Sequence, residues 1–470
     1  MTSHSGNRGA RAGSNSLGSR LDKTIAAGLC AMMVFTALAY GTVEAWSVAI
    51  FELMVAGLAA LWLAKAAVEG RFCVKVPPAA LPLVGLVLVG LAQSAAFIES
   101  DGTVRSLSMD VEATRSAVTL LVFLLIAFVL SANFFTGNRR LSMLANFIVF
   151  YGLALAAFAL VQNFSWDGRF YWIRPNTESA SPFGPFVHHG HFAGYMEMLA
   201  PIPVALLFSG GVRKGSRLIY AASAVVMIIA TVAAWSRGGV ISLASAMAFI
   251  FVVNSVLARS NRRTNERRGR PRASMAIRAA LLAALLAAVA GAGVFWVGLD
   301  PLADGVAGEG RGNSTFHASR GWIWSDTLSM IRANPLTGVG LGAFRTAYPI
   351  YSKSDGSLMV GEAHNDYLQI VADCGILGAI LAAWFIVLIA RAVFRGLRSR
   401  DPFIFGLALG SGAGLFALMV HSVVDFNLQL PANSLLFLVL AAVASRIEAV
   451  VIEREPKPEE KRLVRAATGV

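Results

Sequence analysis

The residues of this sequence that could carry out chemistry are histidines and arginines in polar stretches between long apolar runs. His364 opens the pattern H-N-x9-G-x-x-G, and Arg320 and Arg345 precede it in the longest polar segment, 300–373. An imidazole can take up a proton near neutral pH because its unperturbed pKa is about 6.5. Guanidinium groups bind phosphate oxygens in a bidentate manner. The segment could therefore combine a general base with an anion site.

Two further places carry polar residues at the edges of apolar runs. Arg237 stands in AAWSRGGV, where a charge is costly unless it snorkels, has a partner or serves a function. The following Gly238 and Gly239 allow a close approach of the backbone. His421 and Asp425 lie four residues apart, about one helical turn. This pair fits a structural hydrogen bond as well as it fits a brace for a reactive site.

Three histidines follow a segment rich in proline and glycine, 182–185, which we expect to be irregular. They are His188, His189 and His191. A zinc site needs histidine ligands supported by further Asp, Glu, Cys or His at suitable spacing. Because no HExxH-like pattern accompanies them, we predict no metal site and no cofactor. His191 is expected to line a polar cavity or to contact an acceptor or sugar.

Together these motifs resemble the O-antigen ligase-like family of membrane glycosyltransferases, over about residues 183–445. The resemblance rests on H-N-x9-G-x-x-G, on Arg320 followed by PLTGVGLGAF, and on HSVVDFNLQLPAN. It implies transfer of a glycan from an undecaprenyl diphosphate carrier onto an acceptor hydroxyl. At the position where the family tends to read N-x-F-A, this chain has G-H-F-A, residues 190–193.

The resemblance also assigns roles to the candidate residues. In the family, the arginine of the S-R-G motif binds the diphosphate of the carrier. In this sequence Arg237 stands at that position, so the resemblance gives it this role. No DxD-type acidic pair occurs in the predicted outer loops, so arginines must neutralise the leaving diphosphate. We therefore expect metal-independent, inverting transfer with His364 as general base. The residues expected to bind diphosphate are Arg237, Arg320 and Arg345, and those expected to contact substrate or brace the site are Asn365, Tyr367, His191, His421 and Asp425.

Several functions remain open at this stage. The acceptor could be lipid A-core, a growing polysaccharide or a protein hydroxyl, so ligase and polymerase are not separated. A membrane transporter of the bicarbonate type is an alternative, as is a non-catalytic assembly subunit. A transporter would favour broken helices and ionisable groups at mid-membrane.

The elements that must position these residues are predicted to be membrane helices. Hydrophobic residues make up 56% of the chain and charged residues 14%, against about 25% in soluble domains. Twelve apolar runs are long enough to cross a hydrocarbon core of about 30 Å. We therefore predict an all-α polytopic membrane protein with about twelve transmembrane helices. The runs are 24–41, 46–64, 79–97, 117–134, 143–162, 192–210, 217–235, 239–258, 277–298, 375–394, 403–420 and 433–450.

The distribution of basic residues predicts the orientation. With both termini in the cytoplasm, thirty of the forty Lys and Arg residues fall on the inner side. We therefore predict a multi-pass protein of the bacterial inner membrane. The net charge of +13 then reflects topology and contact with the lipid bilayer, and nucleic acid is not an expected partner.

The predicted organisation follows from this topology. A disordered cytoplasmic tail (1–23) precedes transmembrane helices 1–9 (24–298), and a cytoplasmic tail (451–470) follows helices 10–12 (375–450). Between them lies a large periplasmic loop (299–374), partly helical, in which we expect a helix over 315–332 that Asn334 and Pro335 end. Glycines 338, 340 and 342 suggest a flexible or phosphate-approaching loop, and His364 is expected on a helix leading into the tenth span.

Overall fold

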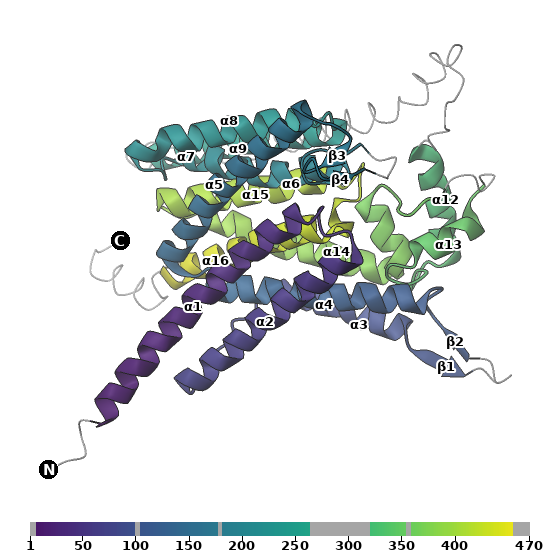
Figure 1. The fold of residues 1–470 in the computed structure, drawn as a ribbon, viewed down its shortest axis with the longest axis horizontal. Helices are drawn as coiled ribbons and strands as arrows, with labels where there is room; N and C mark the ends of the chain where they lie inside the picture. The colour runs from purple at the N-terminus through teal and green to yellow at the C-terminus, as the bar shows by residue number, and fades with distance from the viewer. Residues whose placement is uncertain (1–5, 99–103, 177–180, 264–319, 354–358, 455–470) are drawn as a thin grey trace.

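The computed structural model describes residues 6–98, 104–176, 181–263, 320–353 and 359–454. These residues form an all-α polytopic membrane protein, and strands occur in them only as two short hairpins. The helices pack as a bundle, with α12 and α13 at one end of it, while α1 begins and α16 ends toward the opposite end (Figure 1).

The helices of the first half are α1 (Gly6–Leu38), α2 (Ala45–Glu69), α3 (Ala80–Gln93), α4 (Val111–Phe134), α5 (Gly137–Phe164), α6 (His189–Leu199), α7 (Pro201–Ser209), α8 (Arg217–Ala233) and α9 (Arg237–Arg263). Those of the second half are α12 (Arg320–Ala333), α13 (Phe344–Tyr351), α14 (Asp366–Gly396), α15 (Pro402–His421) and α16 (Pro431–Arg454). Two short 3-10 helices, η1 (Lys214–Ser216) and η2 (Asn427–Gln429), and the antiparallel hairpins β1 (Ala96–Ile98) with β2 (Val104–Ser106) and β3 (Arg169–Phe170) with β4 (Arg174–Pro175) complete the set.

Eleven of the twelve predicted spans coincide with helices. Ten helical stretches are long and apolar enough to cross a membrane, counted over the described residues only. The predicted span 79–97 corresponds to α3, whose 14 residues rise only about 21 Å. The predicted span 277–298 lies outside the described residues, so the described helices account for every predicted run but that one.

Two of the spans are interrupted. Pro201, which has no backbone N–H to donate, starts α7 directly after α6, so that both helices form one stretch from 189 to 209. In α14, Gly375 has φ +61° and ψ −157°, which is far from helical. A β-carbon there would lie 2.3 Å from the carbonyl oxygen of Leu336, so only glycine fits this break.

The loop that follows α12 packs into the break of α14. Ile376 donates its backbone N–H to Pro335, while Val339 and Gly340 donate theirs to Ala372 and Asp373, at 2.9–3.0 Å. Val339 is fully buried. The glycine-rich run was expected to be flexible or to approach phosphate. Instead it packs into the break and forms hydrogen bonds with the backbone groups that the interrupted helix leaves unpaired.

The part of the large loop that is described forms a small folded cap. Apolar residues of α12, α13 and the glycine-rich run share a core with the start of α14, among them Ile323, Met330, Phe344 and Ala372. Helix α12 ends at Ala333, directly before Asn334, which confirms the predicted stop. His364 was expected on a helix, but α14 begins only at Asp366, and His364 lies in the turn before it.

Candidate active site

Three histidines that are far apart in the sequence surround one carboxylate, that of Asp425. His191 Nε2 lies 3.9 Å and His364 Nδ1 4.0 Å from Asp425 Oδ1, and His421 Nε2 lies 3.6 Å from Oδ2. Asp425, His191 and His421 are almost completely buried, whereas His364 is partly exposed. The ring of Phe426 meets the His191 and His364 rings edge-on at 4.7 and 4.8 Å. The cluster thus opens outward only where His364 lies.

Helix α6 presents His191 to Asp425 because its first turn follows a rigid, non-helical entry. Phe183 and Phe186 form an isolated antiparallel bridge, and the His188 side chain accepts the N–H of Gly190 at 3.1 Å, which caps the helix. A β-carbon on Gly190 would lie 2.6 Å from Asp425 Oδ2. Glycine at this position is what allows the carboxylate to approach the helix.

Asparagines hold the loop that carries Asp425. Asn433, in the first turn of α16, donates to the carbonyl of His191 at 3.1 Å and to Asn427 Oδ1 at 2.8 Å. Both asparagines are fully buried. These bonds connect the 422–430 loop to α6 and fix the distance between His191 and Asp425.

A second set of bonds brings His364 to the same loop. Asp366 donates its N–H to the carbonyl of Ser422, and its carboxylate accepts from the Ser422 hydroxyl at 2.7 Å and from Leu428 N–H at 3.2 Å. Asn365 caps α14 by accepting the N–H groups of Tyr367 and Leu368, each at 3.0 Å. The turn ahead of the helix is therefore fixed against the Asp425 loop.

His364 itself has an unusual backbone. Its φ of +49° falls in the left-handed region, which costs a residue with a β-carbon about 1–2 kcal/mol. Its Nδ1 atom is buried and has no hydrogen-bond partner among the described residues. Strained conformations of this kind persist where the surroundings over-determine them, and they concentrate at functional sites.

A buried glutamate lies behind the cluster. Glu197 on α6 is fully buried, and its two carboxylate oxygens lie 3.0 and 3.1 Å from His421 Nδ1. When Nδ1 donates to Glu197, Nε2 of the same ring faces Asp425. A continuous polar path thus runs from Glu197 through His421 and Asp425 to His364.

The positive charge of Arg320, at the start of α12, acts electrostatically on His364 and Asp425. Burial alone would raise the pKa of Asp425. Nearby basic groups oppose this effect and hold the pKa well below its ordinary value; they are His191, His421, His188 and the guanidinium of Arg320. Burial lowers the pKa of His364, and Arg320 lowers it further, against the opposing effect of Asp425. At neutral pH the site therefore holds an anionic aspartate beside a neutral imidazole.

The comparison with known families bears on this site. A family model described as O-antigen ligase matches residues 222–383. This segment of the chain is similar to the O-antigen ligase family. No curated protein sequence matches the chain. The match supports a ligase- or polymerase-like function of the glycosyltransferase type at a membrane. The matched residues include Arg237, Arg320 and His364, whereas His191 and Asp425 lie outside them.

The other predicted residues are placed less centrally. Arg237 is exposed at the first turn of α9, and a β-carbon on the following Gly238 would lie 2.7 Å from the His421 ring, so the N-terminus of α9 adjoins the cluster. Arg345 on α13 contacts Met359 and acts electrostatically on Glu362, two residues before His364. Tyr367 donates its hydroxyl to the carbonyl of Met419 at 2.8 Å, a link between α14 and α15.

Part of the cluster also has the donor set of a metal site. His188, His191 and Asp425 each offer one ligand atom, and these atoms lie within 4.8 Å of one another. Ligands of a tetrahedral zinc ion are about 3.4 Å apart, so the three would have to move closer to bind one. Burial together with His191 lowers the pKa of His188 to about 3, which leaves its ring neutral. The sequence did not suggest this arrangement because Asp425 lies far along the chain.

Two contributors, Glu197 and Asp366, were missed by sequence reasoning. Glu197 had a usable signal, since it is an ionisable residue inside an apolar run, and such residues are functional candidates by default. Asp366 carried no such signal, because its role depends on a contact with Ser422 that only the folded chain creates. His188 was singled out as one of three neighbouring histidines, but its place beside Asp425 was not predicted.

Proposed function

We propose that this protein transfers a glycan from an undecaprenyl diphosphate carrier to an acceptor hydroxyl, with His364 as the general base. The observation that carries the proposal is the convergence of His364 and Asp425 within the electrostatic influence of Arg320, at the end of the bundle where α12 lies. The predicted topology assigns this end to the periplasmic face of the bacterial inner membrane, where lipid-linked glycans would reach it.

The proposed step is a single displacement. The acceptor oxygen bonds to the anomeric carbon while its proton passes to His364 Nε2, and the bond from that carbon to the diphosphate oxygen breaks. The diphosphate leaves with the bonding electron pair, and the anomeric centre inverts. Asp425 supports this step by facing Nδ1, because a proton held there leaves the lone pair on Nε2. The 4.0 Å separation would shorten when substrate binds.

Arginines would neutralise the departing diphosphate. Arg320 is near enough to alter the pKa of both His364 and Asp425, and Arg237 adjoins the cluster through Gly238. Arg345 would extend the positive charge along the cap. Fixed guanidinium groups stabilise the developing charge without reorganisation, so we propose that the reaction is independent of metal.

The acceptor defines two forms of the same proposal. A ligase would use lipid A-core or a protein hydroxyl, and a polymerase would use a growing polysaccharide. Both need the same base and the same diphosphate site, so His364 and Arg320 are expected to be required in either case.

The test replaces His364 with asparagine, which tolerates the left-handed backbone, and separately Arg320 with alanine. Arg332→Ala is the matched control, because it removes an exposed arginine from the last turn of the same helix. In the native host we expect all three variants to reach the membrane. Only the first two should lose high-molecular-weight glycan and accumulate carrier-linked glycan. Unchanged glycan in His364→Asn would refute the assignment.

Transport is the second candidate, because two spans are broken and one of them contains a fully buried carboxyl group. Pro201 interrupts the α6 and α7 stretch four residues after the buried Glu197, and Gly375 interrupts α14. Transporter sites use such broken helices. Uptake of bicarbonate into proteoliposomes that depends on Glu197, together with a normal glycan profile in Glu197→Gln cells, would favour this candidate over glycan transfer.

A further inference from the structure

The ligand atoms of His188, His191 and Asp425, which lie within 4.8 Å of one another, make up a particular donor set. Two imidazoles and one carboxylate suit zinc, whereas magnesium and calcium prefer oxygen ligands alone. Three protein ligands leave the fourth position of a tetrahedral ion to a water molecule. The chemistry of the set therefore selects the metal.

His191 is the residue that points most directly to a ligand. Its Nε2 atom is buried and has no hydrogen-bond partner among the residues that the structure describes. Asp425 Oδ1 lies 3.9 Å from this nitrogen, which is too far for a hydrogen bond. Two ligands of a tetrahedral zinc ion lie about 3.4 Å apart, so an approach of about 0.5 Å would let one ion bind both atoms.

His188 would supply the second nitrogen. Burial and the neighbouring His191 lower its pKa to about 3, so its ring is neutral and can coordinate a metal. Its Nδ1 carries a lone pair, because this atom accepts the N–H of Gly190 at 3.1 Å. Zinc would take the same lone pair and so replace the capping bond at the start of α6.

The carboxylate oxygen that faces His191 also faces the proposed base. Asp425 Oδ1 lies 4.0 Å from His364 Nδ1, whereas Oδ2 faces His421 at 3.6 Å. The backbone N–H of Phe426 donates to Oδ1 at 2.9 Å and fixes the orientation of the carboxylate. A cation on Oδ1 would offset the negative charge that orients His364. It would also repel the positive charge that His364 gains with the acceptor proton.

We infer that His188, His191 and Asp425 bind a zinc ion that inhibits the transfer reaction by withdrawing Asp425 from His364. Zinc is an inhibitor here and not a cofactor, so the inference agrees with metal-independent transfer. It rests on the proposed function for the effect on activity, whereas zinc binding itself does not depend on that function.

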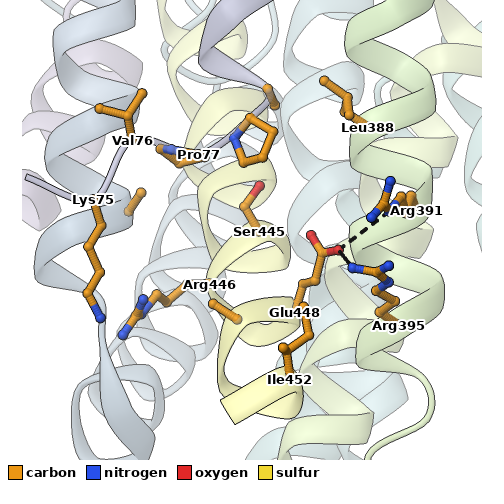
Figure 2. Close-up of a pocket in the computed structure, with 14 residues that line it drawn as sticks. Lys75, Val76, Pro77, Leu388, Arg391, Arg395, Ser445, Arg446, Glu448 and Ile452 are labelled. Atoms are coloured by element: carbon orange, nitrogen blue, oxygen red, sulfur yellow. Dashed lines mark hydrogen bonds and ion pairs between the residues drawn. The ribbon is translucent and has the colours of Figure 1, made fainter.

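The pocket beside the end of α16 differs from this site. It is bounded by the 75–79 loop, α4, α14 and α16 (Figure 2). Its carboxylate, Glu448, pairs with Arg395 at 2.7 Å and lies 3.8 Å from Arg391. Of the described residues that line it, none is a histidine or a cysteine. We therefore expect no competing zinc site among them.

Zinc titration of the purified full-length chain, without a histidine tag, tests the binding. His188→Asn removes a ligand but keeps a side chain that can cap α6. His189→Asn is the matched control, because His189 is the adjacent histidine and its Nδ1 bonds the carbonyl of Ala234 at 2.8 Å. We expect the first change alone to lower zinc affinity at least about a hundredfold, since even residues outside a coordination shell contribute ten- to a hundredfold. All chains carry Cys73→Ser, because this exposed thiol can bind zinc by itself.

Two further measurements connect binding to geometry and to activity. Cobalt(II) should give the intense visible absorption of a four-coordinate site, and His188→Asn should abolish it. In proteoliposomes zinc should inhibit glycan transfer, with each variant compared with its own zinc-free activity. The zinc concentration for half inhibition should rise in His188→Asn by the same factor as the dissociation constant.

Equal zinc affinity in the two histidine variants would overturn the site, as would magnesium binding of equal strength. Zinc binding without inhibition would overturn the regulatory role and leave the proposed glycan transfer unaffected. Absence of transfer in zinc-free membranes would instead refute the proposed function, while the cobalt spectrum still decides the site. If His188→Asn does not fold, Asp425→Asn replaces it in the binding measurement, because an amide keeps the bond from Phe426 but is a weaker ligand.

Discussion

Gly190 and Asp425 are in such close contact that a β-carbon on Gly190 would lie 2.6 Å from an Asp425 carboxylate oxygen. Helix α6 and the 422–430 loop thus meet at a residue small enough to let the carboxylate reach His191, His364 and His421. The relationship makes the glycine a part of the geometry of the candidate site although it has no chemistry of its own.

Gly190→Ala is therefore expected to displace Asp425 and to lower the rate of glycan transfer roughly a hundredfold, the effect expected of a shift of about 1 Å in a catalytic group. The measurement is product formation from a lipid-linked glycan in proteoliposomes. Gly57→Ala on α2 is the control, because no atom lies within 4 Å of the place that its β-carbon would take. Equal activity in the two variants would contradict the role of the close contact.

The pH dependence of the reaction should follow His364. Because burial and Arg320 lower its pKa, the neutral base persists below pH ~6.5, and kcat/KM should fall only at more acidic pH. Arg320→Gln removes a positive charge, which should raise this pKa and move the acid limb to higher pH. Asp425→Asn removes a negative charge, which should move it to lower pH.

Shifts of these two acid limbs in the same direction would rule out His364 as the titrating base. Burial raises the pKa of Glu362 to about 8, so the titration of Glu362 would add a second transition to the pH–rate profile. The profiles are therefore best recorded in a Glu362→Gln background.

Glu197 is expected to act on the reaction through His421. Glu197→Gln keeps a hydrogen-bond acceptor but removes the carboxyl group facing Nδ1, and we expect kcat to fall roughly ten- to a hundredfold while KM for the donor stays close to its original value. Thermal unfolding of the same preparation separates this effect from misfolding. A fall in unfolding temperature that fully accounts for the lost activity would reduce Glu197 to a structural residue.

Removal of divalent metal ions should leave transfer unchanged, because arginines are proposed to carry the diphosphate charge. The measurement is activity after dialysis against EDTA, with a zinc-dependent enzyme as a positive control for the chelation. Activity that is lost and then restored by added zinc would contradict metal independence. It would point instead to His188, His191 and Asp425 as the ligands.

The membrane helices could be predicted from the sequence because hydrophobic run length is a local property. A run near 20 apolar residues must pair its backbone groups within itself, and a helix does this. The predicted spans 403–420 and 433–450 differ from the helical stretches Pro402–His421 and Pro431–Ile452 by one or two residues at each end. The stop of α12 before Asn334 was local as well, because proline disfavours helix in the residue before it.

The candidate site depended on long-range contacts that no local pattern contains. His364 was identified from its motif, but its place outside α14 follows from the Asn365 cap and from the bonds between Asp366 and Ser422. The glycine-rich run suggested a loose loop, and its burial depends on the break at Gly375 that it fills.

The sequence alone thus determined the helical membrane architecture and the residue types available for chemistry. The tertiary structure decided that His191, His364 and His421 share one carboxylate with Glu197 behind it, because this requires side chains more than 200 residues apart to be buried together.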